Sequence, residues 1–444
     1  MKSSIAALAF VLGLATLAQS RLLLQQVTNP DMPQGFTTFW MTDLWSYISN
    51  KPVSSIWMPG THDSGTWDLQ ADTIDSSYAN DCPVDPNNLP LPLDAVVGST
   101  IAAYERGWSV AQVVDLPGQV AAGSRYLDLR VAYSPAQGGY YFTHCLTSVN
   151  SVPQQLQSLS AYLASTYAPS VTRPNGHTPK EVIFLNFYQF YGTWDLARHT
   201  DFMSQVLAAF QPGQIATGVT AASTLESVAQ GGPKVVFIYN DEGIDISTMG
   251  PQVAASFAGQ STFGFDRQWA DKDTAADLIN FDNGQYASYM ANPAPTFKVM
   301  EGVMTEGTSD IEGDPLGTLM SWEGNLGQTM TLWAYSDLNT AYGPSRKPFV
   351  LMLDFLNPIQ AAVIASMNIN AAPGSMPIAG YYGSCSASSS GFLGLSCNNI
   401  NWNNCAPGYT RVYTGNTGGN CGCKCCNPDA SDCGCDLTPG SYCL

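Results

Sequence analysis

Short apolar runs alternate with longer, helix-like stretches along the chain up to about residue 370. Strands are expected at residues 54–58, 124–133, 140–144, 181–188, 234–239, 297–303, 329–334 and 349–355. Helices are expected at 152–167, 194–210, 275–290 and 359–368. Strands that alternate with helices form parallel sheets, because each helix carries the chain back to the start of the next strand. About eight such units predict an α/β fold, a (β/α)8 barrel of the TIM type.

The first residues have the pattern of a secretory signal peptide. Lys2 precedes an apolar run at 5–17, and the small residues Ala18 and Ser20 follow at the spacing of a cleavage site. The run is too short to span a membrane. A buried N-terminal helix is the alternative. We therefore expect residues 1–20 to be a signal peptide and the protein to be secreted, without a transmembrane segment.

Cysteine is concentrated near the C-terminus. Ten of the twelve cysteines lie at 385–443, in a region rich in Gly, Ser and Asn. In an oxidising compartment such a set forms disulfides, although residues 421–426 also resemble a thiolate metal site. We expect a catalytic barrel at 21–370, a linker at 371–380 and a disulfide-rich module at 381–444, whose partner the sequence does not identify. A polar segment at 72–104 is expected to be a surface insertion, and Cys82 and Cys145 could pair.

The charge balance excludes some partners. Lys and Arg number 17 against 35 Asp and Glu, which gives a formal net charge of −18. A surface of this kind argues against nucleic acid as a partner and offers no polybasic attraction to anionic lipid.

The expected strand at 124–133 carries charge on one face. Side chains alternate along a strand, so Leu127 and Leu129 face outer helices while Asp128 and Arg130 face inward. Inward charges are costly unless they are paired or functional. A structural ion pair and a catalytic group are equally good interpretations of this pattern. In the last strand, Asp354 shares the inward face and could orient a histidine or serve as a structural carboxylate.

Two of the four histidines follow strands. His62 and His144 come at the ends of the runs at 54–58 and 140–144, and Asp63 follows the first histidine directly. Active sites of TIM barrels lie at the C-terminal ends of the strands, so this pair suits acid/base catalysis. A zinc site is the rival interpretation. His177 and His199 are expected to be solvated.

Between residues 43 and 370 the chain contains a set of short motifs in a characteristic order. They are PGTHDS at 59–64, WSVAQ at 108–112, QVAAGSRYLDLR at 119–130, His144, PKEVIFLNFY at 179–188, and 349–368. This set resembles the phosphatidylinositol-specific phospholipase C (PI-PLC) X-domain superfamily, especially the X-domain-containing proteins and the metal-independent bacterial enzymes. The cysteine-rich end lies outside the resemblance.

The resemblance implies catalytic roles. His62 would take a proton from a substrate hydroxyl beside the phosphodiester, and Asp354 would hold the working tautomer of His62. Arg130 would stabilise the charge on the phosphate oxygens. His144, supported by Asp63, would protonate the leaving alkoxide.

The resemblance also bears on metal use. Asp128 would orient Arg130 or lie in the same network. Because Arg130 supplies the positive charge and Asp63 stands where calcium-dependent relatives carry Asn, we expect no metal and no cofactor.

Some positions depart from the family's pattern. Relatives usually carry Asp near Asn186 or Lys near Tyr188, and Cys145 stands where glycine usually follows the second histidine. We expect Asn186 and Tyr188 to contact substrate, and Tyr188 and Tyr191 could line a sugar pocket or pack as ordinary aromatics.

Together these residues predict a secreted phosphoric diester hydrolase or lyase of the phospholipase C type. Its expected substrate is phosphatidylinositol, a GPI anchor or a related phospholipid at a membrane surface. A catalytically silent secreted binding or surface protein on the same barrel is the alternative. A metal-dependent phosphodiesterase is the third reading.

Overall fold

The computed structural model describes residues 35–74, 105–314, 317–369, 410–417 and 420–426. The expected signal peptide at 1–20, the linker at 371–380, Cys82 and most of the expected insertion at 72–104 lie outside these residues, so those assignments stay predictions.

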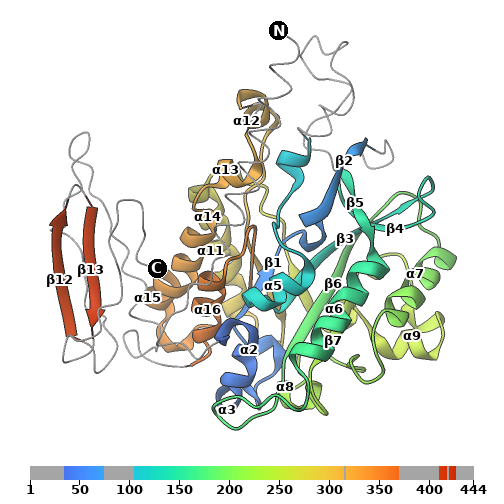
Figure 1. The fold of residues 1–444 in the computed structure, drawn as a ribbon, viewed down its shortest axis with the longest axis horizontal. Coiled ribbons are helices and arrows are strands. Elements are labelled where there is room, and N and C mark those ends of the chain that lie inside the picture. The colour runs from blue at the N-terminus through green and yellow to red at the C-terminus, as the bar shows by residue number, and fades with distance from the viewer. Residues whose placement is uncertain (1–34, 75–104, 315–316, 370–409, 418–419, 427–444) are drawn as a thin grey trace. The chain divides into compact units, whose positions relative to one another are not determined.

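Eight parallel strands form the centre of the described chain (Figure 1). They are β1 (Met58–Thr61), β3 (Tyr126–Ser134), β6 (Val182–Tyr191), β7 (Lys234–Tyr239), β8 (Phe257–Gly259), β9 (Phe265–Arg267), β10 (Phe297–Gly302) and β11 (Val350–Leu353). Each pairs in parallel with the next in this order, except β8 with β9, and β11 pairs with β1. The α/β class is confirmed. Among the described residues no ladder joins β8 to β9, so full closure of the barrel stays a prediction.

An antiparallel extension grows from the edge of β3. It consists of β4 (Gly139–His144), β5 (Leu146–Ser151) and β2 (Leu69–Ile74). The prediction of a barrel strand at 140–144 is therefore wrong. A tight turn, with Gly138 at φ 68°, follows β3 at once, and no helix intervenes to carry the chain back for a parallel pairing.

Other segments also differ from expectation. Residues 329–334 are helical, within α14 (Leu326–Leu332) and the π-turn η5 (Trp333–Asp337). The buried residues there, Leu326, Met330, Trp333 and Ala334, recur at helical spacing. The first strand begins at Met58, because residues 53–55 form a 3₁₀ turn (η1, Val53–Ser55). β8 and β9 went unpredicted because three residues show no periodicity.

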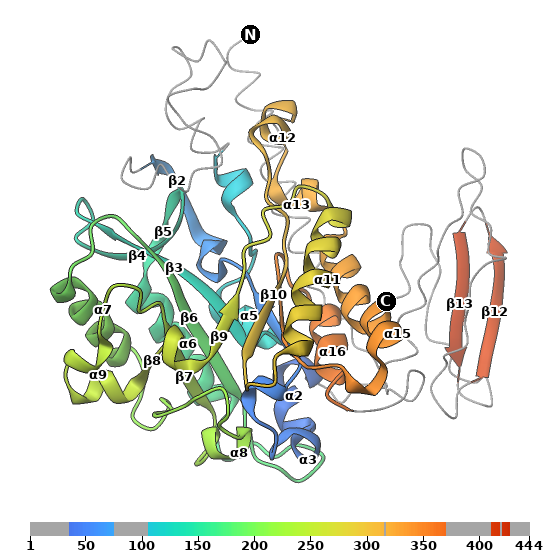
Figure 2. The ribbon, with the colours of Figure 1, turned by 180° about the vertical axis from the view of Figure 1, so that it is seen from behind.

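Helices cover the outer face of the sheet. On one side lie α6 (Val152–Thr166), α7 (Leu196–Ala208) and α9 (Pro251–Ser256), and on the other α11 (Ala275–Ala291), α14 and α16 (Pro358–Ser366) (Figures 1 and 2). Ser151 and Gln154 form a capping box that starts α6, with Pro153 in its first turn. Leu127 and Leu129 of β3 join the buried core under α6 and α7, which confirms the predicted alternation.

Shorter helices close the two ends. α2 (Phe36–Asp43) and α3 (Trp45–Ile48) lie at the end opposite α12 (Thr308–Gly313) and α13 (Leu319–Glu323) in both views (Figures 1 and 2). The remaining elements of this unit are η2 (Ser64–Asp68), α5 (Leu116–Ala122), α8 (Leu225–Val228), η4 (Ile246–Thr248), α10 (Gln260–Phe263), α15 (Leu338–Tyr342) and η6 (Gly343–Ser345).

The described C-terminal residues belong to a separate unit. It contains an antiparallel pair, β12 (Thr410–Thr417) and β13 (Asn420–Cys426). The disulfide-rich module stays a prediction. In the described part of the chain, none of the helices combines the length and the apolar character that a membrane crossing requires.

His199 is not solvated as predicted. It is 7 % exposed on α7, and its Nδ1 lies 2.8 Å from the Tyr239 hydroxyl within an aromatic cluster with Phe190 and Trp194. Burial lowers its pKa. The polar neighbours in sequence point outward, whereas His199 lies on the inward stripe of the helix. His177 is half-buried.

Candidate active site

The six predicted catalytic residues meet where β1 and β11 end, beside residues 128–130 of β3. Within this group, His62 follows β1, Arg130 lies on β3 and Asp354 follows β11. Gln112 ties two of these strands together, because its Nε2 donates to the carbonyls of both His62 and Leu353 at 3.0 Å. This explains the place of the WSVAQ motif: it fixes the backbone that carries the first histidine.

His62 is held from both ring nitrogens. Its Nδ1 lies 2.9 Å from Asp354 Oδ1, and its Nε2 lies 2.9 Å from Arg130 Nη2. The predicted pairing of His62 with Asp354 is therefore present in the structure. A guanidinium can only donate, so the second contact uses the Nε2 lone pair and places the imidazole proton on Nδ1. That tautomer is the one a general base requires.

The pKa of His62 reflects opposing effects. Burial lowers it, while the charges of Asp63 and then Asp354, with the hydrogen bond to Asp354, raise it from 6.5 to about 8. The 2.9 Å contact from Arg130 works against the imidazolium, because an Nε2 proton would face the guanidinium directly. The contact therefore assigns a neutral imidazole to His62.

His144 reaches the site from the antiparallel strand β4 rather than from a barrel strand. Because β4 runs back along β3, its last residue returns to the level of the His62–Arg130 contact. His144 Nδ1 donates to the Ser109 carbonyl at 3.0 Å, which leaves Nε2 directed at Asp63 Oδ2, 4.0 Å away. Ser109 was not singled out from the sequence, since a backbone carbonyl leaves no signature there.

Asp63 lies between the two histidines. Its Oδ2 is 3.6 Å from His62 Nε2 and 4.0 Å from His144 Nε2, but its nearest partner is Arg130, with Nε 2.6 Å from Oδ1. The resemblance assigned Asp63 to support His144, and the geometry adds orientation of Arg130. A Cβ on Gly65 would stand 2.2 Å from Phe142, so glycine lets the turn after Asp63 pack against β4.

Asp128 forms an ion pair with a second arginine, Arg267. Its Oδ1 accepts from Arg267 Nη1 at 2.8 Å, and Arg267 Nε also pairs with Glu301 at 2.7 Å. Asp128 Oδ2 lies 4.0 Å from His62 Nε2, so Asp128 belongs to the same network as Arg130, and orientation of Arg130 by Asp128 stays a prediction. Sequence analysis did not identify Arg267, because the three-residue strand β9 was not predicted. It did not identify Glu301, because the alternation of apolar residues in β10 is weak.

Arg267 supplies a positive charge beside Tyr188, where the family pattern predicts a lysine. Its guanidinium lies 4.0 Å from the ring centre of Tyr188, the position near which bacterial relatives were expected to carry Lys. The side chain has no exposed surface. A cation from β9 thus occupies the surroundings of Tyr188, so the substitution on β6 does not leave this side of the site without positive charge.

Asn186 is enclosed. It is fully buried, donates to the Tyr126 hydroxyl at 2.8 Å and accepts from Gln260 Nε2 at 2.9 Å. Tyr188 is less enclosed and lines a cavity of about 450 Å³ with Gln260 and Arg267. A direct substrate contact therefore fits Tyr188, whereas Asn186 is a buried residue that holds Tyr126 and Gln260 in place.

One trio could in principle hold a metal ion. His62, Asp63 and Asp128 each offer a ligand atom, and these atoms lie within 4.8 Å of one another. The guanidinium groups of Arg130 and Arg267 already face the two carboxylates at 2.6 and 2.8 Å. A divalent cation there would stand beside two fixed positive charges, so the residues fit a metal poorly. The expectation of metal-independent chemistry stays a prediction.

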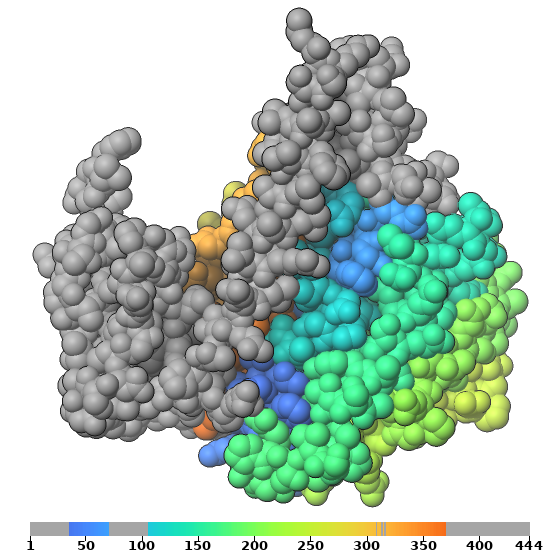
Figure 3. All heavy atoms as spheres, viewed as in Figure 1, coloured from blue at the N-terminus to red at the C-terminus, as the bar shows by residue number. Residues whose placement is uncertain are grey.

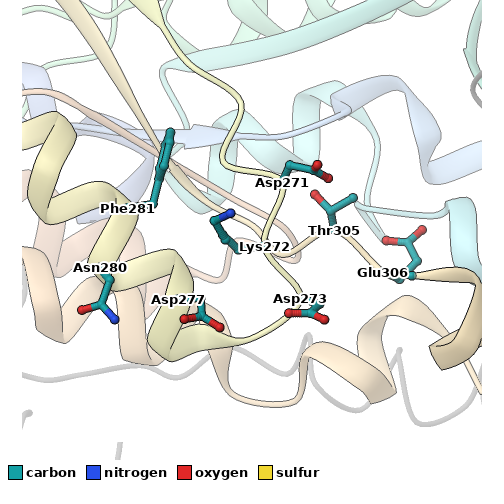
Figure 4. A pocket seen from close by; sticks show the side chains of 9 residues that line it. Asp271, Lys272, Asp273, Asp277, Asn280, Phe281, Thr305 and Glu306 are labelled. Atoms are coloured by element: carbon teal, nitrogen blue, oxygen red, sulfur yellow. The ribbon is translucent and has the colours of Figure 1, made fainter.

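Two acids border the site, Glu105, which is buried, and Glu306, which is half-buried. Burial raises the pKa of Glu105 to about 7, with the charge of Glu306 adding to it, and burial likewise raises the pKa of Glu306. Glu306 interacts electrostatically with His144 and lines a cavity of about 630 Å³. Figure 4 shows Glu306 and Thr305 on the same side of this cavity as Asp271 and Asp273. Glu306 follows the expected strand at 297–303, and residues that follow barrel strands lie at the catalytic rim. Its position in the sequence therefore could have marked it as a site residue.

Trp269 borders the mouth of the site. Its ring centre lies 5.5 Å from that of His62, and the guanidinium carbons of Arg130 and Arg267 lie 5.8 and 5.7 Å from it. It is 37 % exposed, an unusual state for tryptophan, and so presents an aromatic surface to whatever enters.

Backbone strain gathers at the same place. Among the described residues, four that are not glycine have positive φ: Asp63 (39°), Cys145 (60°), Asp271 (50°) and Phe355 (49°). Three are, or directly follow, a predicted catalytic residue. Such conformations persist where the surrounding structure holds them, and they cluster at functional sites. The φ of Cys145 also explains why glycine suits that position in relatives.

On the face shown in Figure 3, most coloured spheres run from blue to yellow-green, with some orange ones, and α5 and α6 lie side by side in the outer shell. The site residues lie on the strands inside this shell. Two imidazole Nε2 atoms, one guanidinium and one shared carboxylate therefore face a common point, an arrangement that can move two protons around one anionic group.

The chain is similar in sequence to known proteins. The chain is 26 % identical over 232 residues to PI-PLC X domain-containing protein 2 of Mus musculus, covering 50 % of this chain and 61 % of the relative. It is 31 % identical over 157 residues to PI-PLC X domain-containing protein 3 of the same organism, covering 34 % and 42 %. It therefore spans less than two thirds of either relative. No family model matches the chain.

Among solved structures, the phosphatidylinositol-specific phospholipase C from Listeria monocytogenes matches with a TM-score of 0.50 at 12 % identity. The match covers 75 % of this chain and 98 % of that chain. At this identity it shows a common fold.

Proposed function

Because this chain is a homologue of the PI-PLC X domain-containing proteins, we propose that it is a phosphoric diester hydrolase or lyase of the phospholipase C type. The observation that carries the proposal is the placement of His62 Nε2 and His144 Nε2 on either side of Asp63 Oδ2, at 3.6 and 4.0 Å, with Arg130 beside them. Acid/base cleavage of a phosphodiester requires such a pair.

In the proposed reaction, His62 Nε2 takes the proton of a substrate hydroxyl as its oxygen attacks phosphorus. The bond from phosphorus to the leaving oxygen breaks. His144 enters this step as an imidazolium, with one proton on Nδ1 for the Ser109 carbonyl and one on Nε2, and it gives the Nε2 proton to the leaving oxygen. In the structure, Arg130 donates to His62 Nε2. When substrate binds, its hydroxyl replaces Arg130 as the donor to His62, and the guanidinium turns to the phosphate oxygens. Asp354 keeps the Nδ1 proton in place throughout.

The proposed substrate is phosphatidylinositol, a GPI anchor or a related phospholipid at a membrane surface. Tyr188 and Trp269 support a ring-shaped head group, since both offer aromatic surface beside the cations. We also propose that the protein is secreted and that residues 381–444 form a disulfide-rich module. These two proposals rest on the signal-like start and on the clustered cysteines.

The purified protein is expected to release cyclic inositol phosphate from phosphatidylinositol vesicles at equal rates with and without EDTA. The reason is that Arg130 and Arg267 supply the positive charge that a metal would otherwise bring. Phosphorus NMR of the products measures both the rate and the cyclic diester.

Loss of cleavage in EDTA would favour the metal-dependent interpretation. A folded protein that cleaves no phosphodiester head group would favour the catalytically silent binding protein on the same barrel.

A further inference from the structure

Glu323 is a buried acid that the proposed reaction does not use. It ends α13, is 7 % exposed, and accepts from the Met304 backbone N–H at 3.4 Å. Gly302 is the ladder partner of Leu353, so Met304, two residues further along, brings the Glu323 carboxyl beside Asp354, within reach of a side-chain hydrogen bond between the two acids. Since Asp354 Oδ1 lies 2.9 Å from His62 Nδ1, the three side chains form one continuous chain.

This contact requires a proton between the two acids. Ionised carboxylates only accept hydrogen bonds, so one member of a hydrogen-bonded carboxyl pair must be protonated. The N–H of His62 Nδ1 points at Asp354 Oδ1 and stabilises the ionised form of Asp354, so the proton is assigned to Glu323. Burial, and then the charge of Asp354 and the hydrogen bond to it, raise the pKa of Glu323 well above its usual range.

We propose that Glu323 is a positioning residue for the base: its protonated carboxyl donates to Asp354 and holds that carboxylate against His62 Nδ1. The inference rests on the proposed function only in naming His62 as the base. The hydrogen bonds themselves are independent of any reaction.

The arrangement has two consequences. The donated hydrogen bond fixes the rotation of the Asp354 carboxylate, so His62 keeps one orientation and one tautomer. It also leaves a single negative charge on the Asp354 side of His62. Ionisation of Glu323 would add a second charge there and raise the pKa of His62 further.

Other charged and titratable groups surround these three side chains and contribute to the same titration. They are Glu306 after β10, Glu105 beside Glu306, Asp63 and His144 near η2 and β4, and Asp128 and Arg130 on β3. A test must therefore change Glu323 and leave them in place.

The test is an NMR titration of the His62 imidazole in the full chain, assigned by comparison with His62→Ala, in wild type, Glu323→Gln and Glu323→Met. In wild type, His62 is expected to titrate with a second, alkaline step as Glu323 ionises. Glu323→Gln keeps a donor but cannot ionise, so the first step stays and the second disappears. Glu323→Met removes the donor and raises the first pKa by roughly one unit, the scale of a hydrogen bond to a charged group.

Asp282→Asn is the matched control. Asp282 on α11 is also buried, with a pKa raised to about 8 by burial and then by the charge of Glu301. Asp282 is not part of the Glu323–Asp354–His62 chain, so this variant should keep the wild-type steps. Titration curves of Glu323→Gln and Glu323→Met that match wild type would overturn the proposal, as would loss of the alkaline step in Asp282→Asn.

The titration needs no turnover. A protein that cleaves no phosphodiester but shows the expected titration would contradict the proposed function and leave the role of Glu323 intact. In an active protein, the acid limb of the kcat/KM profile is expected to move to higher pH in Glu323→Met and to stay in place in Glu323→Gln.

Discussion

His62→Ala is expected to lower kcat/KM for phosphodiester cleavage by about 10²–10⁴-fold, the range of a general acid or base. The substrate hydroxyl then has no acceptor, because Asp63 is committed to Arg130 and Asp354 faces the emptied space from the wrong side. The fold should change little, since His62 follows β1 and adds little to the core. Initial rates on phosphatidylinositol vesicles, with unfolding curves in urea, measure both effects.

His199→Asn provides the matched control for that variant. His199 is equally buried and hydrogen-bonded, but it lies on α7 in the outer core. The His199→Asn variant should lower the free energy of unfolding and leave kcat/KM unchanged. Equal activity of His62→Ala and wild type would remove His62 from the mechanism.

Glu181→Gln is expected to lower the free energy of unfolding by about 3–5 kcal/mol, because it leaves a buried charge uncompensated. Glu181 Oε2 accepts from Arg125 Nε and Nη2 at 2.8 and 2.7 Å, and neither side chain is exposed. Glu181 Oε1 accepts from the Thr42 backbone and hydroxyl at 2.9 and 2.6 Å. The pair thus joins α2 to the starts of β3 and β6.

Two further variants make this prediction specific. Glu226→Gln makes the same change at an exposed glutamate in the first turn of α8, where the loss should stay below about 1 kcal/mol. Replacing both partners, as Arg125→Met with Glu181→Leu, should recover much of the stability, because no charge stays unpaired. A loss below about 1 kcal/mol for Glu181→Gln would show that water or other groups already screen Arg125.

Much of the site could be predicted from strand periodicity. The alternation at 124–133 placed Asp128 and Arg130 inward, and the lone acid on the last strand marked Asp354 as a carboxylate that could orient a histidine. Its pairing with His62, now a 2.9 Å contact, was implied by the family resemblance. These predictions succeeded because the period of two along a strand survives in nine residues of β3.

The failures have equally physical causes. His144 was expected on a barrel strand, yet β4 pairs antiparallel with β3, because the tight turn at Gly138 leaves no room for a helix. Arg267 lies on a three-residue strand, too short for any pattern. Glu323 acts through a contact that is distant in sequence, and a lone glutamate in a helical segment gives no local sign of it.

The proposed reaction gives His62 the role of base and His144 the role of acid, and a change of leaving group separates these two roles. The measurement compares wild type and His144→Ala on phosphatidylinositol and on an inositol phosphodiester with a nitrophenolate leaving group, which needs no proton. We predict that the variant loses about 10²–10⁴-fold on the lipid and far less on the aryl ester. Equal losses on both substrates, or no cleavage of either by the wild-type protein, would contradict the assignment of His144 as the general acid.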